Sequence, residues 1–85
     1  MPEICRFLGL VIYMFYNEHN PPYFHADYDD FSVMIDIKTG DPIKGDFPRR
    51  QLNFLKRWCN MHQEELLENW NKAKSGQPFN PIKPL

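Results

Sequence analysis

Apolar and polar residues alternate with a period of two along residues 23–28 and 31–37. This period places successive side chains on opposite faces of a β-strand, and Asp29-Asp30 between the segments suits a two-residue turn. We therefore predict a β-hairpin whose buried face carries Phe24, Ala26, Tyr28, Phe31, Val33, Ile35 and Ile37. On its other face, the predicted cross-strand pairs are Tyr23 with Asp36, His25 with Met34, and Asp27 with Ser32.

Ahead of this hairpin, the run from Leu10 to Tyr16 is apolar at almost every position. A run with so few polar positions is typical of a strand covered on both faces, so it predicts the central strand of the sheet. Its aromatic residues Tyr13, Phe15 and Tyr16 also suit stacking on nucleic-acid bases, but burial in a core is the favoured interpretation.

Shorter elements complete the predicted sheet. Residues 4–6 form a strand that turns at Gly9 into the apolar run, and a short outer strand begins at Ile43. Between the run and the hairpin, the two prolines of segment 17–22 break regular structure and predict a rigid loop. Residues 3–45 thus predict a compact antiparallel sheet of three to five strands.

From Pro48 to Ser75 the spacing of apolar residues changes to threes and fours, which predicts one long helix over about 48–75. Asp46 is the predicted N-cap, and Gly76 lies where a C-terminal cap belongs. Because a straight helix of this length spans about 42 Å, we expect a bend near Asn60 or a projecting end. The predicted apolar stripe consists of Leu52, Leu55, Cys59, His62, Leu66, Trp70 and Ala73.

The tail, residues 77–85, carries three prolines with Phe79, Ile82 and Leu85 evenly placed among them, which predicts an extended proline-rich segment with docking side chains. Residues 1–85 are long enough for one hydrophobic core, so we predict a single α+β domain. We expect one contiguous core between sheet and helix, formed by Phe24, Val33, Ile35, Leu52, Leu55, Cys59, Leu66 and Trp70.

Composition narrows the functional classes. The formal net charge of -1 gives no global field to attract nucleic acid or an anionic membrane, so any such binding requires a local patch. Cys5 and Cys59 are too few for a disulfide framework and are not spaced as a zinc site. The longest apolar run is much shorter than the roughly 20 residues that span a bilayer. We expect a cytoplasmic protein with reduced cysteines and no membrane partner.

The densest polar cluster consists of His19, Tyr23, His25, Asp27 and Asp36. His25 is the candidate catalytic base, because histidine titrates near neutrality, with His19 and Asp27 as further catalytic candidates and Tyr23 and Asp36 as substrate contacts. The spacing of the two histidines is no established ligand pattern, so we expect neither a metal nor a cofactor. The alternative is a polar face on which His25 hydrogen-bonds a neighbour and steadies the loop.

Arg49 and Arg50 lie in the first turn of the predicted helix, where positive charge opposes the helix macrodipole. Free amide groups at a helix N-terminus bind anions, so two guanidiniums there suit a phosphate, with Lys56 and Arg57 extending the basic strip. A contact with an RNA or DNA backbone is one interpretation of this pattern. Arginines that only solvate the surface or pair with nearby aspartates are the alternative.

Short motifs along the chain fall in the same order and register as in a known family. They are Pro2-Glu3-Ile4, Arg6-Phe7, Gly9, Ile12 to Asn17, His19-Asn20-Pro21-Pro22, Phe24-His25, Pro48-Arg49-Arg50, Trp58, His62, Glu65-Leu66, Asn69-Trp70, Ile82 and Pro84-Leu85. Through these motifs, over essentially its whole length, the chain resembles the bacterial domain of unknown function 4160. It departs from the family at Tyr23, where a histidine is usual.

The resemblance implies a toxin component of a bacterial type II toxin-antitoxin-like system, neutralised by a small antitoxin-like protein encoded nearby. Three hypotheses follow. The first is a toxin acting on nucleic acid, with nuclease-like activity, and it needs His25 and the arginines on one surface. The second is a non-catalytic protein- or nucleic-acid-binding module, a regulator or adaptor. The third is a metal-dependent enzyme, which the tyrosine at position 23 disfavours because tyrosine substitutes poorly for imidazole at zinc.

Overall fold

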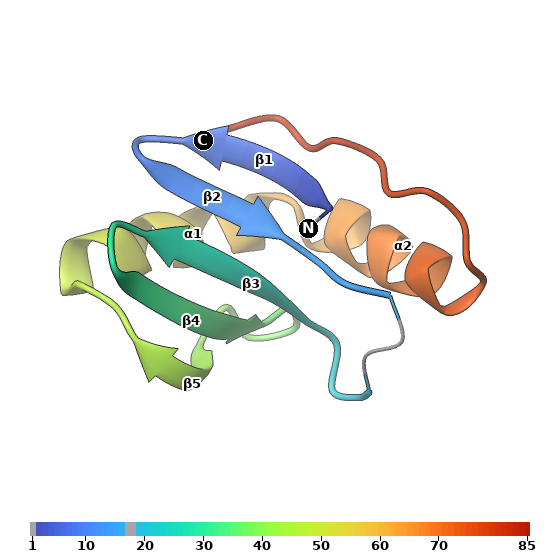
Figure 1. The fold of residues 1–85 in the computed structure, drawn as a ribbon, viewed down its shortest axis with the longest axis horizontal. Coiled ribbons are helices and arrows are strands. Elements are labelled where there is room, and N and C mark those ends of the chain that lie inside the picture. The colour runs from blue at the N-terminus through green and yellow to red at the C-terminus, as the bar shows by residue number, and fades with distance from the viewer. Residues whose placement is uncertain (1, 17–18) are drawn as a thin grey trace.

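A five-stranded antiparallel sheet fills the first half of the chain, and two helices follow it (Figure 1). The structure, a computed structural model, describes residues 2–16 and 19–85. The strands are β1 (Glu3–Phe7), β2 (Leu10–Tyr13), β3 (Tyr23–Tyr28), β4 (Phe31–Asp36) and β5 (Pro42–Asp46). They lie side by side in chain order, so every strand pairs with its neighbour in sequence. The α+β class is confirmed.

The predicted hairpin is present as β3 and β4. Its register pairs Tyr23 with Asp36, His25 with Met34 and Asp27 with Ser32, as the two-residue turn requires. Strand β5 continues this register, because Met34 also faces Lys44 and Ser32 also faces Asp46. The side chains that share a face across β3, β4 and β5 therefore follow from the register.

The prediction that residues 10–16 form the central strand is wrong. Strand β2 ends at Tyr13 and lies second in the sheet, and β3 is central. The helices cover only one face of the sheet (Figure 1). The run is apolar throughout because Tyr13 and Phe15, on the other face, pack around His25 rather than under a second layer.

The prediction of one long helix is also wrong. Two helices are present, α1 (Arg49–Met61) and α2 (Gln63–Lys74), and His62 between them has non-helical dihedrals of φ -125° and ψ 27°. A straight helix of this combined length overruns a sheet within a molecule that measures 34 × 23 × 22 Å. The break lets α2 stay against the sheet, where Leu66 and Trp70 are buried.

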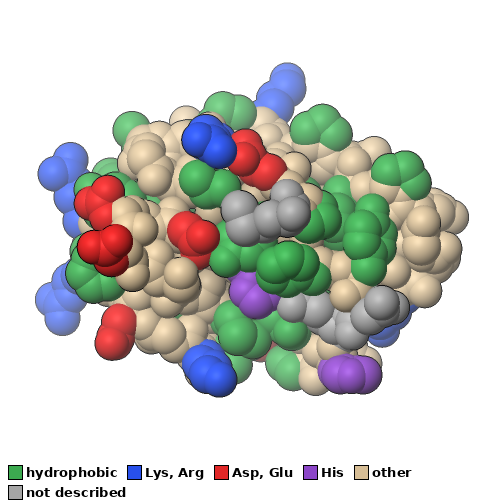
Figure 2. Space-filling view, viewed as in Figure 1, with side chains coloured by type: hydrophobic (Ala, Val, Ile, Leu, Met, Phe, Trp, Pro, Cys, Tyr) green, Lys and Arg blue, Asp and Glu red, His purple; other side chains and the backbone are tan. Residues whose placement is uncertain are grey.

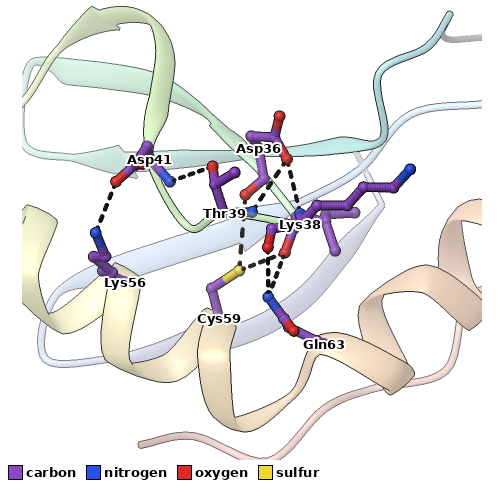
Figure 3. A network of polar contacts seen from close by, with 8 residues as sticks. Asp36, Lys38, Thr39, Asp41, Lys56, Cys59 and Gln63 are labelled. Carbon is purple, nitrogen blue, oxygen red and sulfur yellow. Dashed lines mark hydrogen bonds and ion pairs between the residues drawn. The ribbon is translucent and has the colours of Figure 1, made fainter.

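The start of α2 is fixed by contacts with the turn after β4 (Figure 3). The Gln63 side-chain amide donates to the carbonyls of Ile37, at 3.1 Å, and Lys38, at 2.9 Å. The Cys59 thiol near the end of α1 lies 3.3 Å from the Ile37 carbonyl. Both helices are therefore tied to one turn of the sheet at the point where the chain changes direction.

The two predicted caps have different outcomes. Asp46 ends β5, and the N-cap of α1 is Pro48, which makes no side-chain capping bond, so the Asp46 prediction is wrong. At the other end, Gly76 follows α2 with a φ of +71°, and its N–H donates to the Ala73 carbonyl. This left-handed conformation suits glycine and confirms the predicted C-terminal cap.

The core lies between the sheet and the two helices. Seven of the eight predicted core residues are buried in one cluster, and Leu52 packs against it from a partly buried position. The Trp58 side chain, which is fully buried, contacts the rings of Phe7 and Phe24. This packing confirms the face assignment of β3.

The tail runs back along the molecule toward β1 (Figure 1). Buried Asn69 donates to the Asn80 carbonyl at 2.9 Å and accepts the Asn80 N–H at 2.8 Å. The Ile82 N–H donates to the Ile4 carbonyl of β1, and the Trp58 indole N–H donates to the Lys83 carbonyl. The tail is thus docked by its backbone as well as by side chains.

Candidate functional site

One face of the sheet is covered by helices and the other is not. Strand alternation puts Tyr13, His25, Met34 and Lys44 in one row across this uncovered outer face, since each is the register partner of the next. Figure 2 views this face and shows hydrophobic side chains gathered near its middle. The outer face is therefore more apolar than a solvated sheet surface requires.

His25 lies among three aromatic rings on the outer face. Tyr13 stacks on its imidazole, with ring centroids 5.1 Å apart and planes 8° from parallel. Phe15 and Tyr23 meet the imidazole edge to face, at 5.1 and 5.4 Å. The Tyr23 ring also contacts Trp70 of α2, so it joins the outer face to the core. These contacts hold the imidazole in one orientation, whereas a side chain in open solvent has no such contacts.

Asp27 lies one row further along β3. Its Oδ1 accepts the Tyr13 hydroxyl at 2.9 Å and the Ser32 hydroxyl at 2.8 Å. Both donors are neutral, so these bonds orient the carboxylate without compensating its charge. The structure thus places His25 and Asp27 on the same face and joins both to Tyr13.

A pocket of about 230 Å³ opens beside His25. Its lining residues are His25, Ser32, Val33, Met34, Lys44 and Gly45. Gly45 has a φ of +104°, and a Cβ there would lie 2.3 Å from the Ser32 carbonyl oxygen. Only glycine fits so close to the neighbouring strand.

Asp36, a predicted substrate contact, is engaged in the turn that follows β4 (Figure 3). Its Oδ1 accepts the backbone N–H groups of Lys38, at 2.8 Å, and Thr39, at 3.3 Å. A carboxylate that binds its own backbone two residues on stabilises a turn. This geometry gives Asp36 a structural role in addition to any contact with a ligand.

The remaining predicted site residues lie elsewhere. Arg49 and Arg50 are exposed at the start of α1, on the helix side of the sheet. His19 is exposed in the loop before β3; Asn17 and Glu18 of that predicted rigid loop lie outside the described residues. The structure therefore does not bring the arginines onto the face that carries His25.

The basic residues of α1 have their own contacts. The Arg50 guanidinium lies 5.7 Å from the centre of the Phe54 ring, and Lys56 pairs with Asp41 at 2.8 Å. Arg49 and Arg57 are exposed on the same helix, whose first turn contains no acidic residue. This basic strip on α1 is separate from the pocket beside His25.

The described residues form no group of metal ligands, and both cysteine thiols are buried. Within residues 2–16 and 19–85, no three His, Cys, Asp or Glu side chains are grouped as metal ligands. Both cysteines are buried, and burial raises the pKa of the Cys59 thiol to about 12. A thiol that keeps its proton at neutral pH is a poor nucleophile.

The sequence alone does not single out Met34 and Lys44 as parts of a site. Each becomes visible when the hairpin register is extended by one strand, because His25 faces Met34 and Met34 faces Lys44. Phe15, read as core, has 38% of its surface exposed and contacts His25 instead. The pairing of β3, β4 and β5, rather than a sequence motif, identifies Met34 and Lys44.

No helix in the described part of the chain is long and apolar enough to cross a bilayer.

Comparisons with known proteins identify the family of the chain. None of the curated proteins or solved structures is significantly similar to the chain. A family model described as Domain of unknown function (DUF4160) matches residues 9–71, which extend from the turn before β2 into α2 and exclude β1 and the tail. Since this match spans well over half of the sequence, the chain belongs to that family.

Proposed function

We propose that the protein is a non-catalytic binding module that docks a small protein partner on the outer face of its sheet. The partner is the antitoxin-like protein encoded nearby, and the chain is the toxin-like member of the pair. The toxin-antitoxin arrangement comes from the family resemblance. The choice of surface comes from the geometry of the outer face.

One observation carries the proposal: the face left uncovered by the helices holds the aromatic cluster around His25 and an adjoining pocket. Aromatic residues and methionine are enriched in the buried centres of protein interfaces. Exposed apolar patches bounded by polar residues mark such interfaces on small domains. The face has the composition of an interface centre while no other element of the described chain covers it.

Charge favours protein over nucleic acid on this face. The row next to the pocket carries Asp27 and Asp46, and the turn between β3 and β4 adds Asp29 and Asp30. Among the described residues that line the pocket, Lys44 is the only lysine or arginine. Phosphate backbones require clustered basic residues, and these carboxylates repel them.

Expression of the chain with and without the neighbouring gene tests the proposal. We expect growth inhibition by the chain alone, relief by the second gene, and co-elution of the two products in size-exclusion chromatography. Phe15→Lys places a charge in the aromatic cluster and should abolish both relief and co-elution while toxicity persists. Met61→Lys changes an apolar residue that is 61% exposed in α1 and should leave both unchanged.

Two results would contradict the proposal. Independent elution of the two products at micromolar concentration removes the partner. Loss of co-elution in Met61→Lys but not in Phe15→Lys moves the interface to the helix layer.

The exposed basic surface of α1 favours a second candidate function, contact with RNA or DNA. Arg49, Arg50 and Arg57 are exposed there, and no acidic residue lies in the first turn. In this case Arg49→Ala combined with Arg50→Ala weakens binding to a 20-nucleotide RNA and flattens its salt dependence. His25→Ala then leaves RNA binding unchanged, because His25 lies on the face of the sheet that the helices do not cover.

A further inference from the structure

The pocket beside His25 is too small for an ordinary small-molecule ligand. Its volume of about 230 Å³ lies below the roughly 300 to 1,000 Å³ of sites that enclose such ligands. Interfaces between proteins, by contrast, concentrate their binding energy in single large side chains that fill pockets of this kind. The size of the pocket suits one inserted side chain.

The walls of the pocket favour an aromatic side chain. Met34 supplies a polarisable thioether, the His25 imidazole supplies a flat ring, and Lys44 supplies an ammonium group. Each interacts favourably with an aromatic ring, through sulfur–aromatic contact, ring stacking and cation–π attraction respectively. An acidic side chain would satisfy Lys44 alone, and it would approach the carboxylates of the neighbouring row.

The neighbouring row specifies a second position. Asp27, Ser32 and Asp46 are register partners across β3, β4 and β5, next to the row that contains Met34 and Lys44. Among the described residues, the Asp27 carboxylate accepts hydrogen bonds only from neutral hydroxyl groups, and Asp46 is exposed. Rows on one face of a sheet are separated by two residues of strand, about 6.7 Å, which is also the spacing of residues i and i+2 in an extended peptide.

Resting on the proposed function, we infer that the outer face binds an extended segment of the partner protein that carries an aromatic residue and, two positions away, an arginine or lysine. The aromatic ring enters the pocket between His25, Met34 and Lys44. The basic side chain faces Asp27 and Asp46. The inference adds to the proposed function a rule for which sequences bind.

A peptide library displayed on phage and selected against the full chain tests this rule directly. The enriched 12-residue peptides should share an aromatic residue with arginine or lysine two positions away. In an NMR titration with the most enriched peptide, the largest amide shifts should fall at His25, Met34, Lys44 and Asp46. This measurement needs no variant, so a substitution that fails to fold cannot obscure the outcome.

Variants then test the two positions separately. Met34→Asp should weaken the peptide at least tenfold, and Asp46→Asn should weaken it about threefold and reduce its dependence on salt. Ile43→Gln is the matched control, because Ile43 lies in β5, as Asp46 does, and is 45% exposed but does not line the pocket. It should bind the peptide as the wild type does.

Several outcomes overturn the inference. These are a failure to enrich any peptide, enrichment of acidic residues in place of basic ones, and amide shifts at the pocket produced instead by oligouridine RNA or by self-association of the chain. A different result would contradict the proposed function. If the peptides bind but the neighbouring gene product does not, the binding rule stands and the partner assignment falls.

Discussion

The two faces of the β3–β4 hairpin share one backbone and one register but differ in what their side chains do. On the inner face, Phe24 and Ile35 are fully buried against the helices. On the outer face, the adjoining residues His25 and Met34 are half-buried and line a pocket. Neighbours in sequence therefore belong to different environments, one that stabilises the fold and one that is open to a ligand.

This difference teaches where each kind of mutation acts. Inner-face side chains are enclosed by Trp58, Leu55 and Leu66, so a change there leaves a cavity. Outer-face side chains contact mainly one another, as the ring contacts of His25 show. We expect inner-face changes to lower stability and outer-face changes to alter binding.

The largest effect is expected from truncating adjacent residues on opposite faces. Phe24→Ala should lower the free energy of unfolding by about 3 to 5 kcal/mol, because it empties a fully buried site. His25→Ala should lower it by about 1 kcal/mol, the value of partly exposed ring contacts. Urea unfolding measures both. Equal losses would erase the distinction between the faces; if Phe24→Ala does not fold, Phe24→Leu should show a smaller loss in the same direction.

Asn69→Ala tests how far the enclosed side depends on the tail. The substitution removes both bonds to the Asn80 backbone and should cost about 2 kcal/mol, because it strands a donor and an acceptor. The amide of Asn80 should exchange faster with solvent in the variant. Asn71→Ala, an exposed position on the same helix, should change neither quantity. An unchanged exchange rate at Asn80 would mean that the tail is held by other contacts.

The Cys59 thiol makes the enclosed side sensitive to alkaline pH. Burial raises its pKa from 9.0 to about 12, so the folded state holds the proton more tightly than the unfolded state does. The buried thiol therefore makes its full contribution to the unfolding free energy below pH 9, and this contribution is lost as the pH rises toward 12. The difference in unfolding free energy between the wild type and Cys59→Ala should therefore narrow from pH 8 to pH 11. A constant difference would show that the thiol does not titrate differently in the two states.

The smallest effect concerns the exposed surface of the covering layer. Arg49→Glu should raise the free energy of unfolding by about 0.5 to 1 kcal/mol, since an acidic residue suits the first turn of a helix. Arg50→Glu should gain less, because Arg50 also contacts the Phe54 ring. Paired measurements at low and high salt should show the gain shrinking with salt. A loss for Arg49→Glu would indicate a tertiary role for this arginine.

The sequence predicted local pairing well and long-range placement less well. The hairpin register follows from a period of two and a two-residue turn, which are local properties. The length of the predicted helix indicated a bend near Asn60, but no proline or glycine marks a complete break at His62. It depends on Gln63 and Cys59 meeting the turn after β4, a contact between segments about 25 residues apart.

The site was only partly visible for the same reason. Residue type and alternation located His25 and Asp27 on one exposed face, where the structure finds them. The hypothesis of a toxin acting on nucleic acid needed Arg49 and Arg50 on that face too, but the pattern of the chain does not say on which side of a sheet a following helix packs. The packing of Trp58 on Phe24 shows that α1 lies against the inner face.

The docked tail has a consequence for how the molecule behaves at high concentration. An exposed edge strand can pair with a strand of another molecule, which is a common route to aggregation. The backbone N–H of Ile82 donates to the Ile4 carbonyl of the edge strand β1, so the tail shields this edge. The opposite edge strand, β5, carries Pro42, Lys44 and Asp46, residues that discourage strand addition. Loosening the tail should therefore expose β1 and promote self-assembly before the domain unfolds.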